Sequence, residues 1–116
     1  GDGKQVRDIL YIDDLCDLFH KISVSKKKNK NIIFNVGGGN KFSLSLLELI
    51  NILKKKKLNP KFTYSKWRKG DQKIYISDNS KIINQFNWKP KINPNKGIDI
   101  LIKWIKENKT VISKIF

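Results

Sequence analysis

The sequence predicts a mixed α/β module with about four helices and several short strands. Two observations support this fold class. Several stretches repeat apolar residues at the spacing of amphipathic helices, and short runs rich in Ile, Val, Phe and Tyr lie between them. The chain has 116 residues, which is enough for one small domain with a hydrophobic core.

A strand and a helix are the first predicted elements. Residues 6–12 mix apolar and β-branched types in a short extended run. Asp13 or Asp14 can then act as the N-cap of a helix that runs to about Val24. After a lysine-rich stretch, residues 32–36 are predicted to form a buried strand that ends at three consecutive glycines.

The second predicted helix begins at Ser43 or Ser45. Ser45 and Glu48 have the spacing of a capping box, in which the serine and glutamate side chains each bind a free backbone N–H group. Pro60 ends the segment that follows. The apolar face of this helix is expected at Leu46, Leu49, Ile50 and Leu53.

The second half of the chain is predicted to contain two short strands and two helices. Residues 61–64 and 73–77 have strand character. Asp78, Asn79 or Ser80 can cap the third helix, and Asn93-Pro94 is an N-cap followed by proline at the first helical position. The predicted apolar faces are Ile82, Ile83 and Phe86 in the third helix and Ile98, Leu101, Ile102 and Ile105 in the last.

Arginine occurs at two positions only, Arg7 and Arg68, among 25 basic residues. A planar guanidinium binds phosphate through two parallel N–H groups, which lysine cannot do. Arg68 precedes Gly70 and Asp71, so a tight turn can place a guanidinium and a carboxylate side by side. We therefore expect both arginines to bind a ligand through the paired N–H groups of the planar guanidinium.

Several motifs occur along the chain in a fixed order. They are G-x-Q-V-R-D-I-L-Y-I-D-D-L, F-N-V-G-G-G, S-L-S-L-L-E-L, R-K-G-D-Q, N-W-K-P-K and Gly97-Ile98. Together they resemble the C-terminal part of the extended short-chain dehydrogenase/reductases that modify nucleotide sugars, and within that family they look most like the CDP-paratose 2-epimerases. The resemblance covers roughly residues 3–105.

The resemblance implies that residues 1–116 are one C-terminal substrate-binding module whose N-terminal Rossmann half is missing. The chain has no G-x-G-x-x-G loop and no Tyr-x-x-x-Lys sequence, so no residue of this chain is expected to be catalytic or to bind NAD. In the intact isomerase, the resemblance implies a tightly held NAD. The chain alone is expected to be inactive, and the missing Rossmann domain is an expected partner.

The same resemblance implies a nucleotide-diphosphate sugar as ligand. Arg7 and Arg68 correspond to the family's diphosphate contacts, Asp71 to a ribose contact and Tyr75 to an aromatic position near the nucleotide. Gln5 has an amide that can reach a sugar or a base edge.

Each of these residues also has a purely structural interpretation. Arg7 can form a surface ion pair with Asp8 or Asp2, Gln5 can face solvent, and Tyr75 can pack under the turn. Asp13 and Asp14 are adjacent carboxylates, but their place at a helix start favours capping over acid–base chemistry. Trp88 and Trp104 are expected to pack in the core or between subdomains.

The net charge of +15 suggests a nucleic-acid-binding module as an alternative of a different class. The two lysine runs, residues 26–30 and 54–57, contain no aromatic residues, which favours a solvated basic surface. Two further alternatives are a UDP- or dTDP-sugar 4-epimerase or dehydratase part, and a degenerate piece with only a packing role.

The remaining composition predicts few other partners. One Cys and one His cannot provide the ligands of a structural zinc site, so no metal is expected. No apolar stretch is long enough to span a membrane, and a cytoplasmic location is the default expectation. The sequence does not predict whether the protein forms an oligomer.

Overall fold

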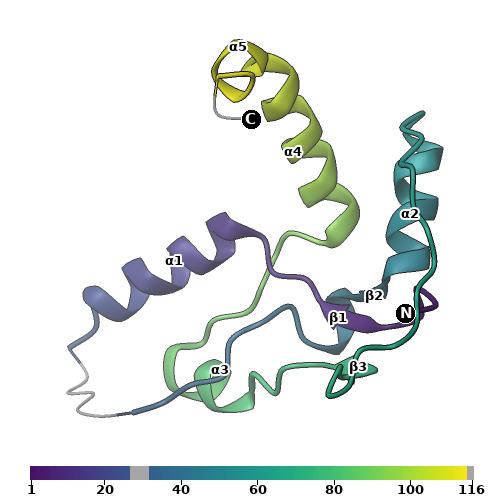
Figure 1. Cartoon of the computed structure of the whole chain (residues 1–116). Helices are drawn as coiled ribbons and strands as arrows, with labels where there is room; N and C mark the ends of the chain where they lie inside the picture. The colour runs from purple at the N-terminus through teal and green to yellow at the C-terminus, as the bar shows by residue number, and fades with distance from the viewer. Residues whose placement is uncertain (27–31, 115–116) are drawn as a thin grey trace.

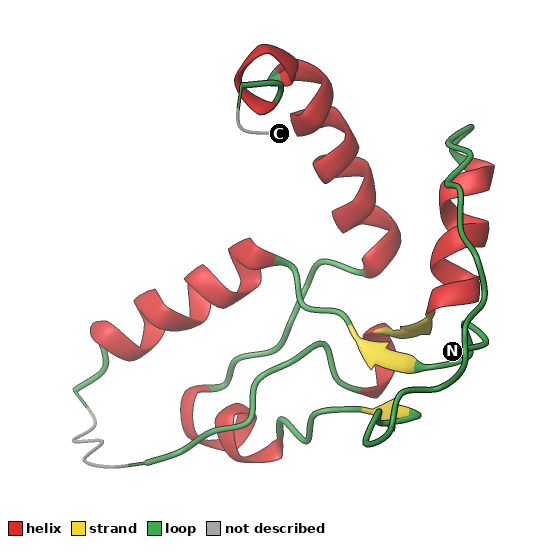
Figure 2. Ribbon diagram, viewed as in Figure 1, coloured by secondary structure: helices red, strands yellow, loops and turns green. Residues whose placement is uncertain are grey.

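The computed structural model describes residues 1–26 and 32–114. It is a mixed α/β structure, as predicted, and Figure 2 shows its helices arranged around a small sheet. The elements in chain order are β1 (Val6–Asp8), α1 (Ile12–Ser23), the 3-10 helix η1 (Asn40–Phe42), β2 (Ser43–Ser45), α2 (Leu46–Lys55), β3 (Ile74–Tyr75), α3 (Ser80–Phe86), α4 (Pro94–Glu107) and α5 (Lys109–Ile112).

The sheet has three strands in the order β2-β1-β3. β1 pairs antiparallel with β2 and parallel with β3. The register places Arg7 of β1 between Leu44 of β2 and Tyr75 of β3. One of the two arginines therefore lies in the central strand, where the backbone is hydrogen-bonded on both sides.

The core lies between α1, α3 and the segment after α3. Leu18, Ile82, Phe86 and Trp88 form it, and each is at most 6% exposed. The Phe34 ring packs edge-on against Phe86, with 5.7 Å between ring centroids. Trp88 is a core residue, as predicted, and its indole N–H donates to the backbone carbonyl of Asp14 at 3.1 Å. This bond links the first turn of α1 to the segment that leads into α4.

The predicted cap at Asp13 or Asp14 is wrong, because Tyr11 is the N-cap residue of α1. Both aspartates lie inside the first turn, where their negative charge interacts favourably with the positive end of the helix dipole. Asp14 is 3% exposed, and its Oδ2 accepts the backbone N–H groups of Lys91 and Ile92 at 3.0 and 2.9 Å. Asp14 is thus a structural carboxylate, although it does not cap the helix.

The other predicted caps are confirmed where their partners are local. The Ser45 hydroxyl accepts the N–H of Glu48 at 3.2 Å, and the Glu48 carboxylate accepts the N–H of Ser45 at 2.6 Å. The Asn93 side chain accepts the N–H of Lys96 at 3.0 Å, with Pro94 at the first helical position. Lysines 54 and 55 lie in the last turn of α2.

The predicted strands are less accurate. β1 ends at Asp8, which is earlier than residues 6–12 suggested. Residues 32–36 and 61–64 are not strands in the described structure. Ile33 is 83% exposed, so residues 32–36 do not form the predicted buried strand. A strand needs a pairing partner, and neither segment has one within the described residues. The lysine run 26–30 lies outside the described residues beyond Lys26.

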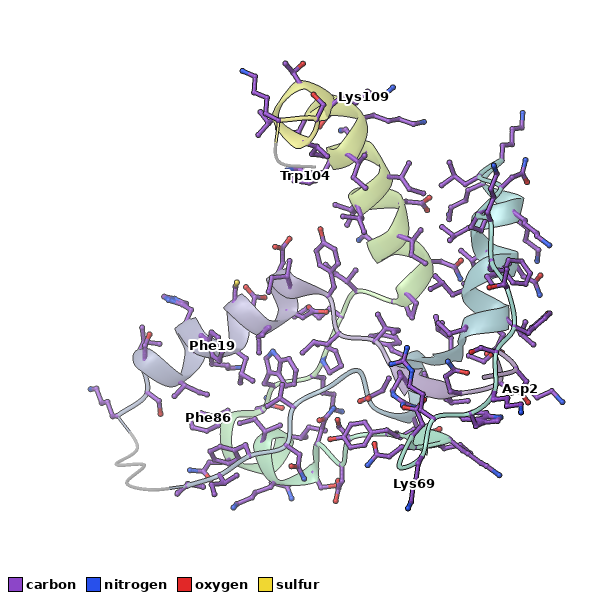
Figure 3. All side chains as sticks on the ribbon, viewed as in Figure 1. Asp2, Phe19, Lys69, Phe86, Trp104 and Lys109 are labelled. Atoms are coloured by element: carbon purple, nitrogen blue, oxygen red, sulfur yellow. The ribbon has the colours of Figure 1, made fainter. Side chains whose placement is uncertain are left out.

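The molecule is open in shape. Its radius of gyration is 17.1 Å, whereas a compact domain of this length has about 13 Å. Figure 1 shows α1, α2 and α4 extending away from the sheet in different directions. Phe19 on α1 and Trp104 on α4 are 61% and 53% exposed (Figure 3). Trp104 is therefore not a core residue, because no other described element covers that side of α4, and its packing against another subdomain stays a prediction.

Candidate functional site

One cavity brings together three of the five predicted site residues. Gln5, Arg68 and Asp71 all line it, and its volume is about 370 Å³. Its walls come from the start of the chain, from α2 and from the loop between α2 and β3. The other lining residues are Gly1, Gly3, Leu46, Leu47, Ile50, Phe62, Thr63, Tyr64 and Ser65.

A tight turn places Arg68 and Asp71 at this cavity. The N–H of Asp71 donates to the carbonyl of Arg68 at 3.2 Å, and Gly70 has φ +86° between them. A Cβ at Gly70 would meet no atom within 4 Å, so the positive φ alone accounts for the glycine. Lys69 marks this turn in Figure 3, on the loop that returns from α2 to β3. The turn leaves the Arg68 and Asp71 side chains exposed at the cavity.

Gln5, which lines the same cavity, has an unsatisfied acceptor. Its Oε1 is buried and has no hydrogen-bond partner within residues 1–26 and 32–114. A buried polar atom without a partner is unfavourable by about 1–3 kcal/mol. A ligand hydroxyl or amine would remove this cost, and the Gln5 side chain can therefore serve as a hydrogen-bond acceptor toward a ligand.

Arg7 and Tyr75 are neighbours in the sheet and lie outside the lining of this cavity. The Arg7 Nη1 donates to the carbonyl of Val6 at 2.8 Å. In the described part of the chain Arg7 forms no ion pair with Asp2 or Asp8. Tyr75 is 44% exposed. The cavity therefore does not bring these two residues together with Gln5, Arg68 and Asp71, and the Arg7 guanidinium is not engaged by a carboxylate.

Asp8, next to Arg7 in β1, has a structural role that sequence reasoning missed. Its Oδ2 accepts the N–H groups of Gly39 and Ser77 at 3.0 and 3.1 Å. Burial of the Asp8 carboxyl group opposes its ionisation, but hydrogen bonds from Gly39 and Ser77 outweigh this effect and hold its pKa below the ordinary value of 3.8. The adjacency of Asp8 to Arg7 was the one available signal, and it suggested an ion pair instead.

The glycine turn at residues 37–39 is structural, as predicted, and it is not a cradle for a diphosphate. A Cβ on Gly37 would overlap with Asp8 and Ser77, and one on Gly38 would overlap with the carbonyl of Ile9. The N–H of Gly37 donates to the Asn79 side chain at 3.1 Å, and the N–H of Gly39 donates to Asp8. These N–H groups are therefore not available to a dinucleotide.

Two aromatic residues at the cavity were also missed. Phe62 and Tyr64 pack edge to face with ring centroids 5.6 Å apart. The Lys54 ammonium lies 5.7 Å from the centroid of the Phe62 ring. Residues 61–64 were interpreted as a strand, and this interpretation hid their role as one wall of the cavity.

Metal-ligand clusters and membrane-spanning helices are absent from the described residues. No group of three or more His, Cys, Asp and Glu side chains in that part of the chain is arranged to hold a metal ion. Among the described helices, none combines the length and the apolar character that crossing a membrane requires.

Comparison with known proteins identifies the family. The profile of the family described as GDP-mannose 4,6 dehydratase matches residues 1–101. The chain belongs to this family. The curated relatives of this dehydratase family member include the CDP-paratose 2-epimerase of Salmonella typhi, 35% identical over 90% of the chain, and the UDP-glucuronate 4-epimerase of Thermodesulfobacterium geofontis, 36% identical over 99%. The resemblance to nucleotide-sugar-modifying enzymes is thereby confirmed.

Solved structures of relatives have the same fold. The UDP-glucuronic acid 4-epimerase of Bacillus cereus, in complex with UDP-4-deoxy-4-fluoro-glucuronic acid and NAD, superposes on 92% of the chain with a TM-score of 0.80 and 28% identity. The UDP-glucose 4-epimerase of Thermotoga maritima, with UDP-glucose, superposes on 93% with a TM-score of 0.78 and 28% identity. The matched regions are 34% of each of those chains, and the chain spans about a third of its curated relatives. It corresponds to their C-terminal portion, as the sequence motifs predicted.

Proposed function

We propose that this chain is the nucleotide-sugar-binding part of an NAD-dependent nucleotide-sugar epimerase that acts on a CDP-sugar, as CDP-paratose 2-epimerase does. The observation that supports this most directly is the convergence of Gln5, Arg68 and Asp71 on one cavity. A guanidinium, a carboxylate and an unsatisfied amide oxygen are groups that bind a phosphate and hydroxyls. The relative from Salmonella typhi supports the CDP-sugar assignment.

The proposed binding mode uses each side chain for one part of the ligand. Arg68 binds the diphosphate through paired N–H groups, and Arg7 approaches it from the sheet. Asp71 accepts a hydrogen bond from a ribose hydroxyl, and the Gln5 Oε1 accepts one from a sugar hydroxyl or a base amine. Tyr75 lies beside the nucleotide. Contacts to the nucleotide fix the position of the sugar, so binding energy distant from the reacting carbon orients it.

NAD binding is assigned to another part of the protein. Asp8, Ile9 and Ser77 pack closely against the glycine turn, and the N–H groups of Gly37 and Gly39 are already used, so this turn does not fit a dinucleotide. The apolar sides of α1 and α4 and the exposed residues 32–33 provide a surface on which an NAD-binding Rossmann domain can pack. The open shape of the chain supports this two-part arrangement.

A UDP-sugar 4-epimerase is the second candidate. The relative that acts on UDP-glucuronate is 36% identical to this chain over 99% of its length, which is slightly more than the CDP-paratose 2-epimerase. The diphosphate and ribose contacts proposed here are equally suited to both ligands, so the base and the sugar decide between them.

A panel of nucleotide sugars tests the proposal. We expect the complete polypeptide that carries this chain to bind CDP-sugars in preference to UDP- and dTDP-sugars in calorimetry, and to epimerise a CDP-sugar when NAD is present. Preference for a UDP-sugar would favour the second candidate. Binding of no nucleotide sugar would contradict both.

The chain by itself is expected to be inactive. We expect residues 1–116, incubated with NAD and the same panel of sugars, to show no turnover and no micromolar affinity for NAD. Turnover by the isolated chain would contradict the assignment of NAD to another part of the protein.

A further inference from the structure

The carboxylate of Asp8 joins three segments that are distant in the sequence. It accepts N–H groups from Gly39 and Ser77, which are 31 and 69 residues away. Both bonds involve a charged acceptor, and such bonds are roughly twice as strong as neutral ones. Asp8 is the last residue of β1, so the end of the central strand is fixed against two loops.

The packing around this carboxylate allows little movement. Ser77 and Asn79 are 8% and 7% exposed. The Asn79 side chain makes two hydrogen bonds to Gly37: its Oδ1 accepts the Gly37 N–H, and its Nδ2 donates to the Gly37 carbonyl. Gly37 approaches Asp8 and Ser77 so closely that a Cβ would overlap with both. The three segments therefore fit together in one arrangement, with the Asp8 carboxylate between them.

Arg7 precedes Asp8 in the same strand. Because side chains alternate along a strand, these two residues point to opposite faces of the sheet. The register of β1 against Leu44 and Tyr75 also fixes the backbone of Arg7. Asp8 can thus secure the strand from one face, while Arg7 remains available to a ligand on the other.

We propose that Asp8 is a positioning residue for diphosphate binding: it holds the end of β1 against the loops at Gly39 and Ser77 and so keeps Arg7 in place for the diphosphate. This inference rests on the proposed function, since it requires Arg7 to contact a diphosphate. It assigns Asp8 no contact with the ligand.

The test separates ligands with a diphosphate from ligands without one. The probes are CDP, UDP, cytidine and uridine, titrated by calorimetry into the complete polypeptide. Asp8→Asn keeps the size of the side chain but directs an NH2 group or a neutral oxygen at the N–H donors. We expect it to weaken CDP and UDP binding by about tenfold, with nucleoside affinity unchanged. Asp78→Asn is the matched control, because it removes the same charge nearby, and it should change neither.

A second comparison asks whether Asp8 acts through Arg7. In an Arg7→Lys background, Asp8→Asn should have little further effect on CDP binding, because the group that Asp8 positions is already lost. A general structural role would instead weaken nucleosides and diphosphates alike, by the same factor in both backgrounds, and that result would overturn the inference.

Two further outcomes are also decisive. If Asp8→Asn does not fold, Ser77→Ala removes one hydroxyl from the same network and should give a smaller loss that is still confined to the diphosphates. Equal loss for nucleosides would overturn the positioning role. If the unmodified polypeptide binds neither CDP nor UDP, the proposed function fails first, and the positioning role with it.

Discussion

At the scale of single residues, the two arginines differ in their surroundings. Arg68 lines the cavity beside Asp71, whereas Arg7 lies in the central strand with its guanidinium on the Val6 carbonyl. A neutral carbonyl is a weaker partner than a phosphate for a guanidinium. The Arg7 side chain can therefore exchange this contact for a ligand without breaking an ion pair.

Replacing either arginine by lysine tests the proposed clamp. Arg7→Lys and Arg68→Lys keep the charge but remove the paired donors, so CDP-sugar binding should weaken by about 1–3 kcal/mol each, with little change in thermal midpoint. The double variant should differ from the sum of the singles, because both groups contact one diphosphate. Calorimetry on the complete polypeptide gives these values, and Lys69→Ala on the same turn is the control. Unchanged binding in both single variants would assign the arginines to the surface.

Asp8 also predicts how stability changes with pH. Its pKa is lower in the folded chain than in the unfolded one, so it contributes stability that is present above the unfolded pKa, near 3.8, and is lost as pH falls through the folded pKa. The free energy of unfolding, measured by denaturant titration between about pH 2 and 6, should fall on acidification. Glu48 and Asp78 also have lowered pKa values. The contribution of Asp8 is therefore the difference between the pH dependence of the unmodified protein and that of Asp8→Asn. Equal pH slopes in both proteins would contradict the role assigned to its hydrogen bonds.

At the scale of elements, the sequence predicted the contacts between residues close in the chain but not those between residues distant in the chain. Caps such as Ser45 with Glu48 and Asn93 with Lys96 join residues three apart, so the sequence displays both partners. Asp8 and Asp14 bind N–H groups at least 31 residues away, and no short motif displays such a pair. Residues 32–36 have the composition of a strand, but strand formation depends on a partner elsewhere.

The same contrast applies to the candidate site. The resemblance supplied Gln5, Arg68 and Asp71, and the fold brings them to one cavity. Phe62 and Tyr64 were not predicted, because an aromatic residue in a loop has no sequence pattern that marks it as part of a wall.

The turn at Gly70 provides a test at this scale. Gly70→Ala places a Cβ in open space but forces a side chain to adopt φ +86°, which is unfavourable by about 1–2 kcal/mol. Because the turn holds Arg68 next to Asp71, we expect weaker CDP-sugar binding together with a small loss of stability. Gly70→Asn tolerates positive φ better and should recover much of the binding. If Gly70→Ala binds as well as the unmodified protein, the turn geometry is not needed.

At the scale of the whole molecule, the charge of +15 is the most prominent property. Lysines 54 and 55 lie at the end of α2, and Lys56 forms an ion pair with Asp99 of α4. These lysines interact with a helix end and with a carboxylate of the same chain, as residues of an ordinary basic surface do. We expect oligonucleotide binding to be weak, without sequence preference, and lost by ~0.2 M salt. Fluorescence anisotropy across a salt series measures this, and a sequence-selective complex at high salt would support the nucleic-acid alternative.

The open arrangement of α1, α2 and α4 also affects how the chain unfolds. Unfolding raises the heat capacity in proportion to the apolar surface that becomes exposed to water, and a compact domain of 116 residues has a change of about 1.4–1.7 kcal/mol/K. Phe19, Trp104 and Ile33 are already exposed in the folded chain. Calorimetry of residues 1–116 alone should therefore give a smaller heat-capacity change and a shallow dependence of stability on temperature. Within a larger protein that covers these helices, their apolar surface would contribute fully to the heat-capacity change, and stability would depend steeply on temperature.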